Sequence, residues 1–236
     1  MDSNNLNKKI GVAAKWSVAT EIAAKLISPI SNMILARFLT PEAFGVVATV
    51  TMITSFADMF TDAGFQKYLV QHDFKDKKDQ FDSTTVAFWT NLFISLFLWF
   101  IIICNRDWLA KIVGNPNLGI VIAVACFSLP LTSFSSIQMA LFRREFAFKT
   151  LFVVRLIAIC VPIVVTVPLA IVTRSYWSLI IGTISVNLVN AIVLTIKSEW
   201  KPRLFYSFDK FKEMFSFSFW TLVEQIAIWL TSYIDT

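Results

Sequence analysis

The sequence predicts an all-α membrane protein, a polytopic helical bundle with six full spans and the start of a seventh. Hydrophobic residues make up 56% of the 236-residue chain and charged residues only 16%, whereas roughly a quarter of the residues in a soluble domain are charged. Several uncharged runs reach the roughly 20 residues that a helix needs to cross a bilayer core. No strand pattern that could close a barrel is visible, so helices are the expected spanning structure.

The expected spans differ in how apolar they are. The first two carry scattered polar residues, whereas the third to sixth lack Asp, Glu, Lys and Arg, except for Arg155 at the leading edge of the fifth. Prolines inside spans remove a backbone donor and permit kinks; Pro162 is one of them. The full spans are expected at about 12–35, 43–65, 83–105, within 112–142, at 156–173 and at 175–196, and a seventh begins near Phe215.

Positive charge is unevenly divided between the two sets of connecting segments. With the N-terminus inside, fifteen of the 21 Lys and Arg residues fall in segments on the cytoplasmic side, and only Arg37, Arg106, Lys111 and Arg174 fall in the opposite loops. Cytoplasmic loops of membrane proteins carry an excess of Lys and Arg. We therefore predict a cytoplasmic N-terminus, and the net charge of +5 reflects topology rather than nucleic-acid binding.

The longest polar break between spans, "KSEWKPRLFYSFDKFKEM", alternates aromatic and basic residues. This pattern is typical of a segment on the inner leaflet, anchored here by Trp200, Phe205 and Tyr206. Residues 16–32 also align without gaps with residues 220–236, with six identities, which suggests parallel repeats with substrate between two six-helix lobes. We divide the chain into a six-helix lobe at 1–198, an interfacial connector at 199–214 and the start of a second lobe at 215–236.

Polar residues recur on one face of several expected spans. A charge inside a membrane is costly unless it is paired or faces water, and it then usually marks a pathway. Several helices with one polar face each therefore suggest a bundle around a hydrated cavity. The residues concerned include Glu21, Lys25 and Asn32 in the first span, Asp58 and Asp62 in the second, Asn187 in the sixth and Glu224 in the seventh.

The charged residues also have structural interpretations. Glu21 and Lys25 lie four residues apart and could neutralise each other between helices. Asp58 and Asp62 lie near the cytoplasmic end of their span, where solvation competes with ion binding. Arg155 could extend to lipid headgroups from the inner interface. For each residue, the functional and the structural interpretation both stand.

Four stretches resemble motifs of one transporter family. "LARFLTPEAFGVVA" is similar to its L-A-R-x-L-x-P-x-x-F-G motif, and "FADMFTDAGFQKYLVQ" to the end of its second span. "LFRREFAFK" resembles its A-L-x-R-R-x-F-x-F-K loop, and "KPRLFYSF" its R-P-x-x-x-F-S segment. The family is that of the Wzx-like polysaccharide and O-antigen flippases of the MOP exporter superfamily, distantly related to MATE drug exporters. The resemblance runs from about Lys15 to Thr236.

This resemblance implies a MATE/MOP-like N-terminal lobe, as an N-terminal fragment of a protein with about twelve to fourteen spans. It implies movement of an undecaprenyl-diphosphate-linked oligosaccharide across the bacterial inner membrane by alternating access, coupled to Na⁺ or H⁺. The implied partners are membrane lipids, a polysaccharide polymerase and glycosyltransferases. The chain departs from the family at "TRSYWSL", where relatives often have a Gly-rich turn.

The polar faces and the implied substrate together suggest site residues. A diphosphate needs cations, sugars need hydroxyl or amide groups, and a coupled ion needs carboxylates. The expected substrate-binding residues are Lys25, Arg37, Arg155, Asn32 and Asn187. The expected ion-coupling residues are Glu21, Asp58, Asp62 and Glu224.

No catalytic residue, metal site or cofactor is expected. The sequence has no G-x-x-x-x-G-K-[ST] nucleotide motif and no visible nucleophile or acid–base set. Two alternatives to the flippase stay open. A cation-coupled multidrug exporter would use Glu21, Asp58 and Asp62, whereas a non-transporting scaffold of polysaccharide assembly would use the polar faces only to hold helices together.

Overall fold

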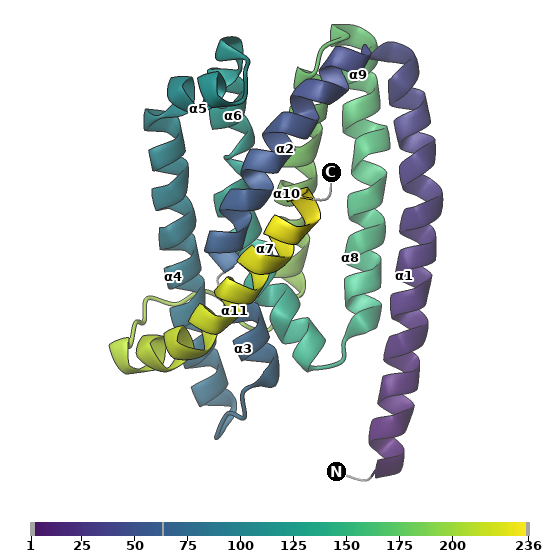
Figure 1. Ribbon diagram of the computed structural model, residues 1–236. Helices are drawn as coiled ribbons and strands as arrows, with labels where there is room; N and C mark the ends of the chain where they lie inside the picture. Colours follow the sequence, from purple (N-terminus) through teal and green to yellow (C-terminus); the bar gives the residue numbers. More distant parts are fainter. Residues whose placement is uncertain (1–2, 63, 235–236) are drawn as a thin grey trace.

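The computed structural model describes residues 3–62 and 64–234 and is a bundle of helices (Figure 1). Within these residues there is no strand, and six helical segments are long and apolar enough to cross a membrane. The predicted all-α polytopic fold is therefore confirmed. The six segments are Ala14–Phe38, Pro41–Thr61, Lys77–Cys104, Pro116–Arg144, Phe148–Thr173 and Trp177–Lys197.

Four of these segments are single helices and two are composite. The single ones belong to α1 (Ser3–Phe38), α2 (Pro41–Asp62), α4 (Lys77–Cys104) and α10 (Trp177–Lys197). The fourth segment joins a 3-10 turn (Pro116–Leu118), α6 (Gly119–Ala125) and α7 (Ser128–Arg144). The fifth joins α8 (Phe148–Val161), a π-helical turn (Pro162–Thr166) and α9 (Val167–Thr173). The remaining helices are α3 (Phe65–Gln71), α5 (Arg106–Ile112) and α11 (Phe208–Ile234).

The segments predicted to be cytoplasmic gather at one end of the bundle. In Figure 1 the N-terminus, α3, the turn between α7 and α8 and the start of α11 lie at the lower end. The turn between α1 and α2, together with α5 and α9, lies at the upper end. Because most Lys and Arg residues belong to the first group, the lower end is termed the basic end.

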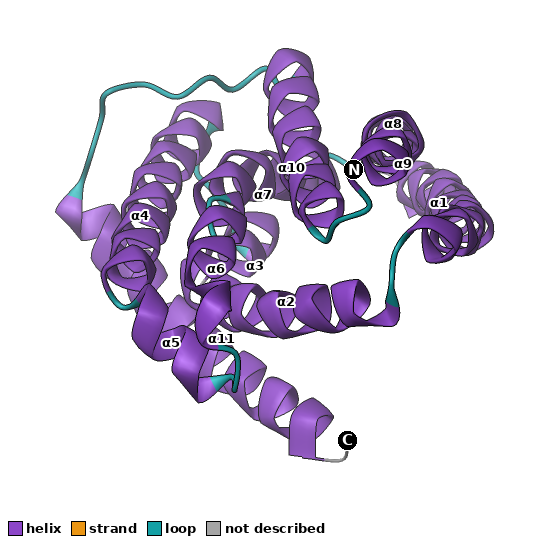
Figure 2. Ribbon diagram, turned by 90° about the horizontal axis from the view of Figure 1, so that it is seen from above, coloured by secondary structure: helices purple, strands orange, loops and turns teal. Residues whose placement is uncertain are grey.

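The helices are arranged side by side around α7 (Figure 2). α4 and α10 pack against α7, α8 packs against α10, and α1 packs against α8 at the edge of the bundle. Two apolar clusters fill the half away from the basic end, and a further one, which includes Leu69, Phe88 and Met214, lies toward the basic end between α3, α4, α7 and α11. The first two clusters include Val50, Ile122, Leu129 and Ile180 between α2, α6, α7 and α10, and Leu35, Leu39 and Ala170 between α1 and α9.

The π-helical turn begins at Pro162, one of the prolines expected to disturb a span. Proline cannot donate a backbone hydrogen bond, so the helical ladder changes register around it. α10 approaches this turn closely at Gly182, which is buried. A side chain at position 182 would meet Thr166, the last residue of the turn.

Gly182→Ala is therefore expected to destabilise the fold. A Cβ at this position would lie 2.1 Å from Thr166 Oγ1 and 3.0 Å from its Cβ, inside van der Waals contact. Overpacking of this kind costs about 1–3 kcal/mol, so the melting temperature of the purified protein should fall. The double variant Gly182→Ala, Thr166→Ala should recover part of the loss. An unchanged melting temperature for the single variant would contradict this packing.

The connector between α10 and α11 is bound to α4. Trp200 is only 2% exposed, donates its indole N–H to Thr85 Oγ1 at 3.1 Å and packs edge-on against Phe88. The indole N–H of Trp89 donates to the carbonyl of Arg203 at 2.7 Å. The prediction that Trp200 anchors the connector in the leaflet is therefore wrong, because a protein pocket buries its ring.

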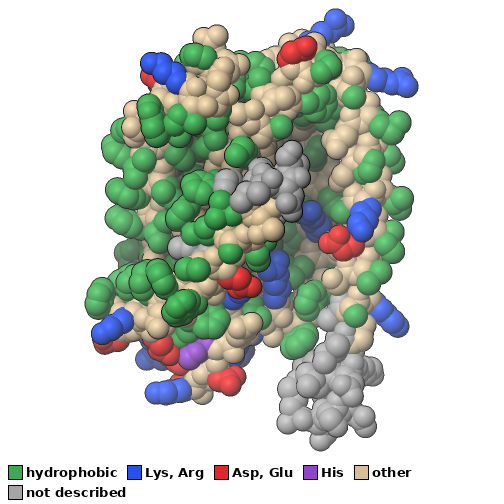
Figure 3. Space-filling model, in the orientation of Figure 1, with side chains coloured by type: hydrophobic (Ala, Val, Ile, Leu, Met, Phe, Trp, Pro, Cys, Tyr) green, Lys and Arg blue, Asp and Glu red, His purple; other side chains and the backbone are tan. Residues whose placement is uncertain are grey.

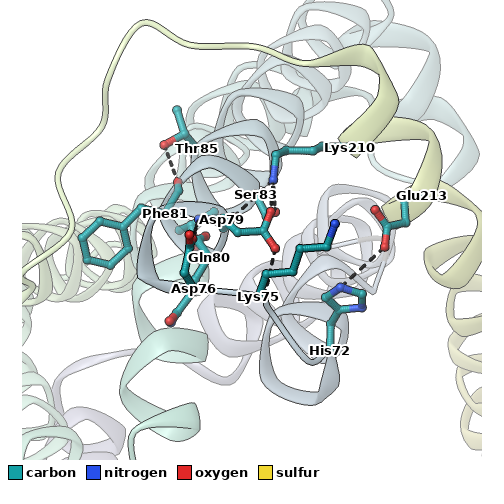
Figure 4. Close-up of polar contacts among 11 residues, drawn as sticks. His72, Lys75, Asp76, Asp79, Gln80, Phe81, Ser83, Thr85, Lys210 and Glu213 are labelled. Carbon is teal, nitrogen blue, oxygen red and sulfur yellow. Dashed lines mark hydrogen bonds and ion pairs between the residues drawn. The ribbon is translucent and has the colours of Figure 1, made fainter.

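α11 corresponds to the predicted start of the seventh span, but it begins at Phe208, ahead of the expected boundary at 215. It packs against α2, α3 and α4. Burial and the carboxylate of Glu213 on α11 raise the pKa of Tyr68 on α3. Three polar contacts fix the helix in place. Two are ion pairs, of Lys210 with Asp79 and of Glu224 with Lys67 at 2.9 Å, and the third joins Glu213 to Nε2 of His72 at 3.5 Å; Figure 4 shows the contacts of Lys210 and Glu213.

Candidate functional site

Three adjoining hollows meet at Arg155 of α8, which lines all of them. Their volumes are about 460, 400 and 190 Å³. Figure 3 shows charged side chains, blue and red, at mid-height in a hollowed part of the surface, apart from those at the two ends of the bundle. The bundle therefore contains hollows whose walls include residues from the predicted polar faces.

The large hollow, of about 460 Å³, lies between α2, α4, α7, α8 and α10. Its wall carries several polar side chains, among them Asp58 from α2, Thr132 from α7 and Asn187 and Asn190 from α10. The hydroxyl of Thr132 donates to Asp58 Oδ1 at 3.2 Å. Arg155 lines the same hollow, so one space presents a carboxylate, amides and a guanidinium.

The other two hollows extend this space along α1. The hollow of about 400 Å³ lies between α1, α7, α8 and α10, with Glu21 and Arg143 in its wall. The hollow of about 190 Å³ is lined by Ser31 and Asn32. α1 runs from the basic end to the opposite end. The hollow of about 400 Å³, here called the second hollow, contacts the earlier part of α1 and so lies toward the basic end; the third hollow, of about 190 Å³, contacts a later part and lies farther along the helix.

The packing of α8 directs Arg155 into these hollows. Val154 is buried against Phe142 and Leu194, and Ala158 is also buried, which fixes the rotation of the helix. Arg155 makes no hydrogen bond or ion pair with any residue that the structure describes. Its five N–H donors are therefore free, and a free cation at membrane depth requires water or an anionic ligand.

Comparison with known proteins identifies the family. The sequence profile of a family described as polysaccharide biosynthesis protein matches residues 34–236. The chain belongs to this family. The match covers most of the chain and confirms the resemblance that the four short motifs indicated.

Three curated relatives are bacterial polysaccharide biosynthesis or membrane proteins. A succinoglycan biosynthesis transport protein of Rhizobium meliloti is 27% identical over 92% of this chain and 43% of its own length. An uncharacterized membrane protein in the cps region of Klebsiella pneumoniae is 21% identical over 98% of this chain and 48% of its own. The lipopolysaccharide biosynthesis protein WzxC of Escherichia coli is 21% identical over 98% and 47%.

This member of the polysaccharide biosynthesis family thus spans about half the length of the curated relatives it matches. No solved structure matches it significantly. Together with the six apolar helices, the family establishes the chain as an integral membrane protein.

The structure brings together only some of the predicted substrate-binding residues. Arg155, Asn187 and Asn32 all line the hollows. Lys25 and Arg37 are exposed and line none of the three. The amides and the guanidinium predicted to receive a substrate therefore share one space, without these two cations.

The predicted ion-coupling residues are likewise divided. Asp58 lines the large hollow and Glu21 the second. Glu21 forms no ion pair with Lys25 in the described part of the chain, so direct pairing between them does not account for their charges. Glu224 is paired with Lys67 and lines none of the three hollows. The side chain of Asp62 lies outside the described residues.

Sequence reasoning missed several further lining residues, among them one on α4. Asn91 is 1% exposed on α4 and donates its amide to Ser136 Oγ at 3.1 Å. It is the one side-chain amide within the uncharged run 83–104, and this isolated polarity could have marked it as a residue that faces the interior. Arg143 and Gln66 also line hollows, but their positions in polar segments made them resemble ordinary loop residues.

Proposed function

We propose that the chain forms part of an exporter that moves polysaccharide precursors across a membrane. Relatives named for succinoglycan transport and for lipopolysaccharide biosynthesis support export. The observation that carries the proposal is Arg155, a guanidinium without a partner among the described residues, at the junction of three polar hollows. Such a cation suits an anionic cargo.

The finer proposal is a lipid-linked oligosaccharide carried on undecaprenyl diphosphate. Diphosphate and sugars cannot enter hydrocarbon without losing their hydrogen bonds. A guanidinium can bind phosphate with two parallel hydrogen bonds, so Arg155 receives the diphosphate. Asn187 and Asn32 then bind sugar hydroxyls, while the lipid chain stays in the bilayer. Lys25 and Arg37 are secondary cation contacts, since neither lines a hollow.

Transport is proposed to proceed by alternating access in a bacterial inner membrane, with the basic end cytoplasmic and the movement coupled to H⁺ or Na⁺. Asp58 and Glu21 are the favoured coupling carboxylates because they share hollows with Arg155. Asp62 and Glu224 remain secondary candidates. A polysaccharide polymerase and glycosyltransferases are the proposed partners.

The test uses a bacterium that lacks its own polysaccharide flippase and expresses the full reading frame. Surface polysaccharide and efflux of a cationic dye are measured in the same cells. Restored polysaccharide without efflux is the expected result. Efflux without polysaccharide would favour a drug exporter that uses Asp58 and Glu21, and neither activity, with protein present in the membrane, would favour a scaffold.

A further inference from the structure

The second hollow, of about 400 Å³, is lined by a cation that the proposed function has not used. Arg143 lies in the last turn of α7, at the basic end, and lines this hollow together with Glu21 and Arg155. The large hollow shares Arg155 and Asn190 with it. A polar route therefore leads from the basic end, past Arg143, to the junction at Arg155.

The two arginines that end α7 have different structural roles. Nη1 of Arg144 contacts three carbonyl oxygens in the segment 69–72 at distances of 2.6–3.1 Å, so its guanidinium caps the end of α3. Arg143 is exposed and has one side-chain hydrogen bond among the described residues, to Gln66 Oε1 at 3.4 Å. A contact of this length is weak, so most donors of Arg143 are available to a ligand.

The charge of the second hollow favours an anion. Its charged lining consists of the guanidinium groups of Arg143 and Arg155 and the carboxylate of Glu21. Cations thus outnumber carboxylates in a cleft with low-dielectric walls, which concentrates the field and raises the rate at which anions arrive. Arg143 is exposed and lies in the last turn of α7, toward the basic end, whereas Arg155 also lines the other two hollows.

We propose that Arg143 is a first contact site for the diphosphate group of a prenyl-type lipid, which then passes to Arg155. This inference rests on the proposed function, since it supplies an approach to the same central site. A charge at the rim of a binding site mainly changes the association rate, whereas a charge at its centre mainly changes the dissociation rate. Loss of Arg143 should therefore change mainly the association rate, and loss of Arg155 mainly the dissociation rate.

The experiment measures both rates for farnesyl diphosphate, a prenyl diphosphate without sugars, on the full-length protein in lipid nanodiscs. Arg143→Gln is expected to slow association about three- to tenfold and to change dissociation less than about twofold. Arg155→Gln is expected to speed dissociation about tenfold or more. Lys149→Gln removes an exposed charge at the same end that lines no hollow, and both rates should stay near those of the unaltered protein.

The outcomes separate this inference from the proposed function. Normal association in Arg143→Gln, with faster dissociation in Arg155→Gln, would overturn the role of Arg143 alone. Failure of the unaltered protein to bind the probe would overturn diphosphate recognition at both residues. Equal competition by inorganic pyrophosphate would overturn the assignment to a lipid. Should Arg143→Gln not accumulate, Arg143→Lys keeps the charge without the planar fork, and its association should remain faster than that of a neutral variant, Arg143→Ala.

Discussion

Arg155→Gln is expected to reduce export about ten- to hundredfold while the protein still reaches the membrane. Arg155 has no hydrogen bond to the described residues, so its loss leaves none of their donors or acceptors without a partner. A hydrogen bond to a charged group contributes about 1.5–3 kcal/mol, and each 1.4 kcal/mol corresponds to about a factor of ten. The measurement is surface polysaccharide in flippase-deficient cells, normalised to the amount of protein in the membrane.

Two matched variants separate the position of the charge from its presence. Arg155→Lys keeps a cation but loses the planar fork, so an intermediate export rate is expected. Arg174→Gln removes an exposed arginine at the far end of α9 that lines none of the three hollows, and export should be unchanged. Normal export by Arg155→Gln would mean that the central cation does not bind the cargo.

The spans and the central residues could be predicted because the bilayer imposes a simple rule. A membrane helix must be about 20 residues long and mostly apolar, so the spans are visible as runs and a polar residue within a run is conspicuous. Arg155, Asn187 and Asp58 were found in this way, and all three line the large hollow. The π-helical turn at Pro162 follows from the missing backbone donor of proline.

What the sequence did not predict depends on contacts between distant segments. Trp200 lies in an alternating aromatic and basic segment that suits either a lipid headgroup layer or a protein groove, and its partner Thr85 lies 115 positions earlier. Glu224 appeared to be part of a polar face, but its partner Lys67 lies 157 positions away. A local sequence pattern shows that a residue is polar, but it does not show which residue of a distant segment its side chain contacts.

The same limit explains why the two arginines of "LFRREF" could not be told apart. Adjacent residues on a helix point about 100° apart, so one can face a hollow while the other faces a neighbouring helix. Which of them does so depends on how α7 is rotated against α3 and α8. The structure places Arg144 on the end of α3 and Arg143 in the second hollow.

Arg144→Gln is expected to destabilise the fold by about 2–4 kcal/mol, because it leaves three part-buried carbonyl groups without this donor and a buried group without a partner costs about 1–3 kcal/mol. The guanidinium also lies 4.7 Å from the ring centroid of Phe74, a cation–π contact that contributes about 0.5–1 kcal/mol at such sites. Protein in the membrane and the melting temperature after purification should therefore both fall.

The neighbouring variant Arg143→Gln is the matched control, since it makes the same chemical change one position earlier. Its side chain has one hydrogen bond in the described chain, the long one to Gln66, so abundance and melting temperature should stay near those of the unaltered protein. Loss of stability in Arg144→Gln alone would show that one arginine holds α3 in place. Equal loss in both variants would instead mean that the end of α7 needs positive charge without regard to position, and the separate roles assigned to the two residues would then be wrong.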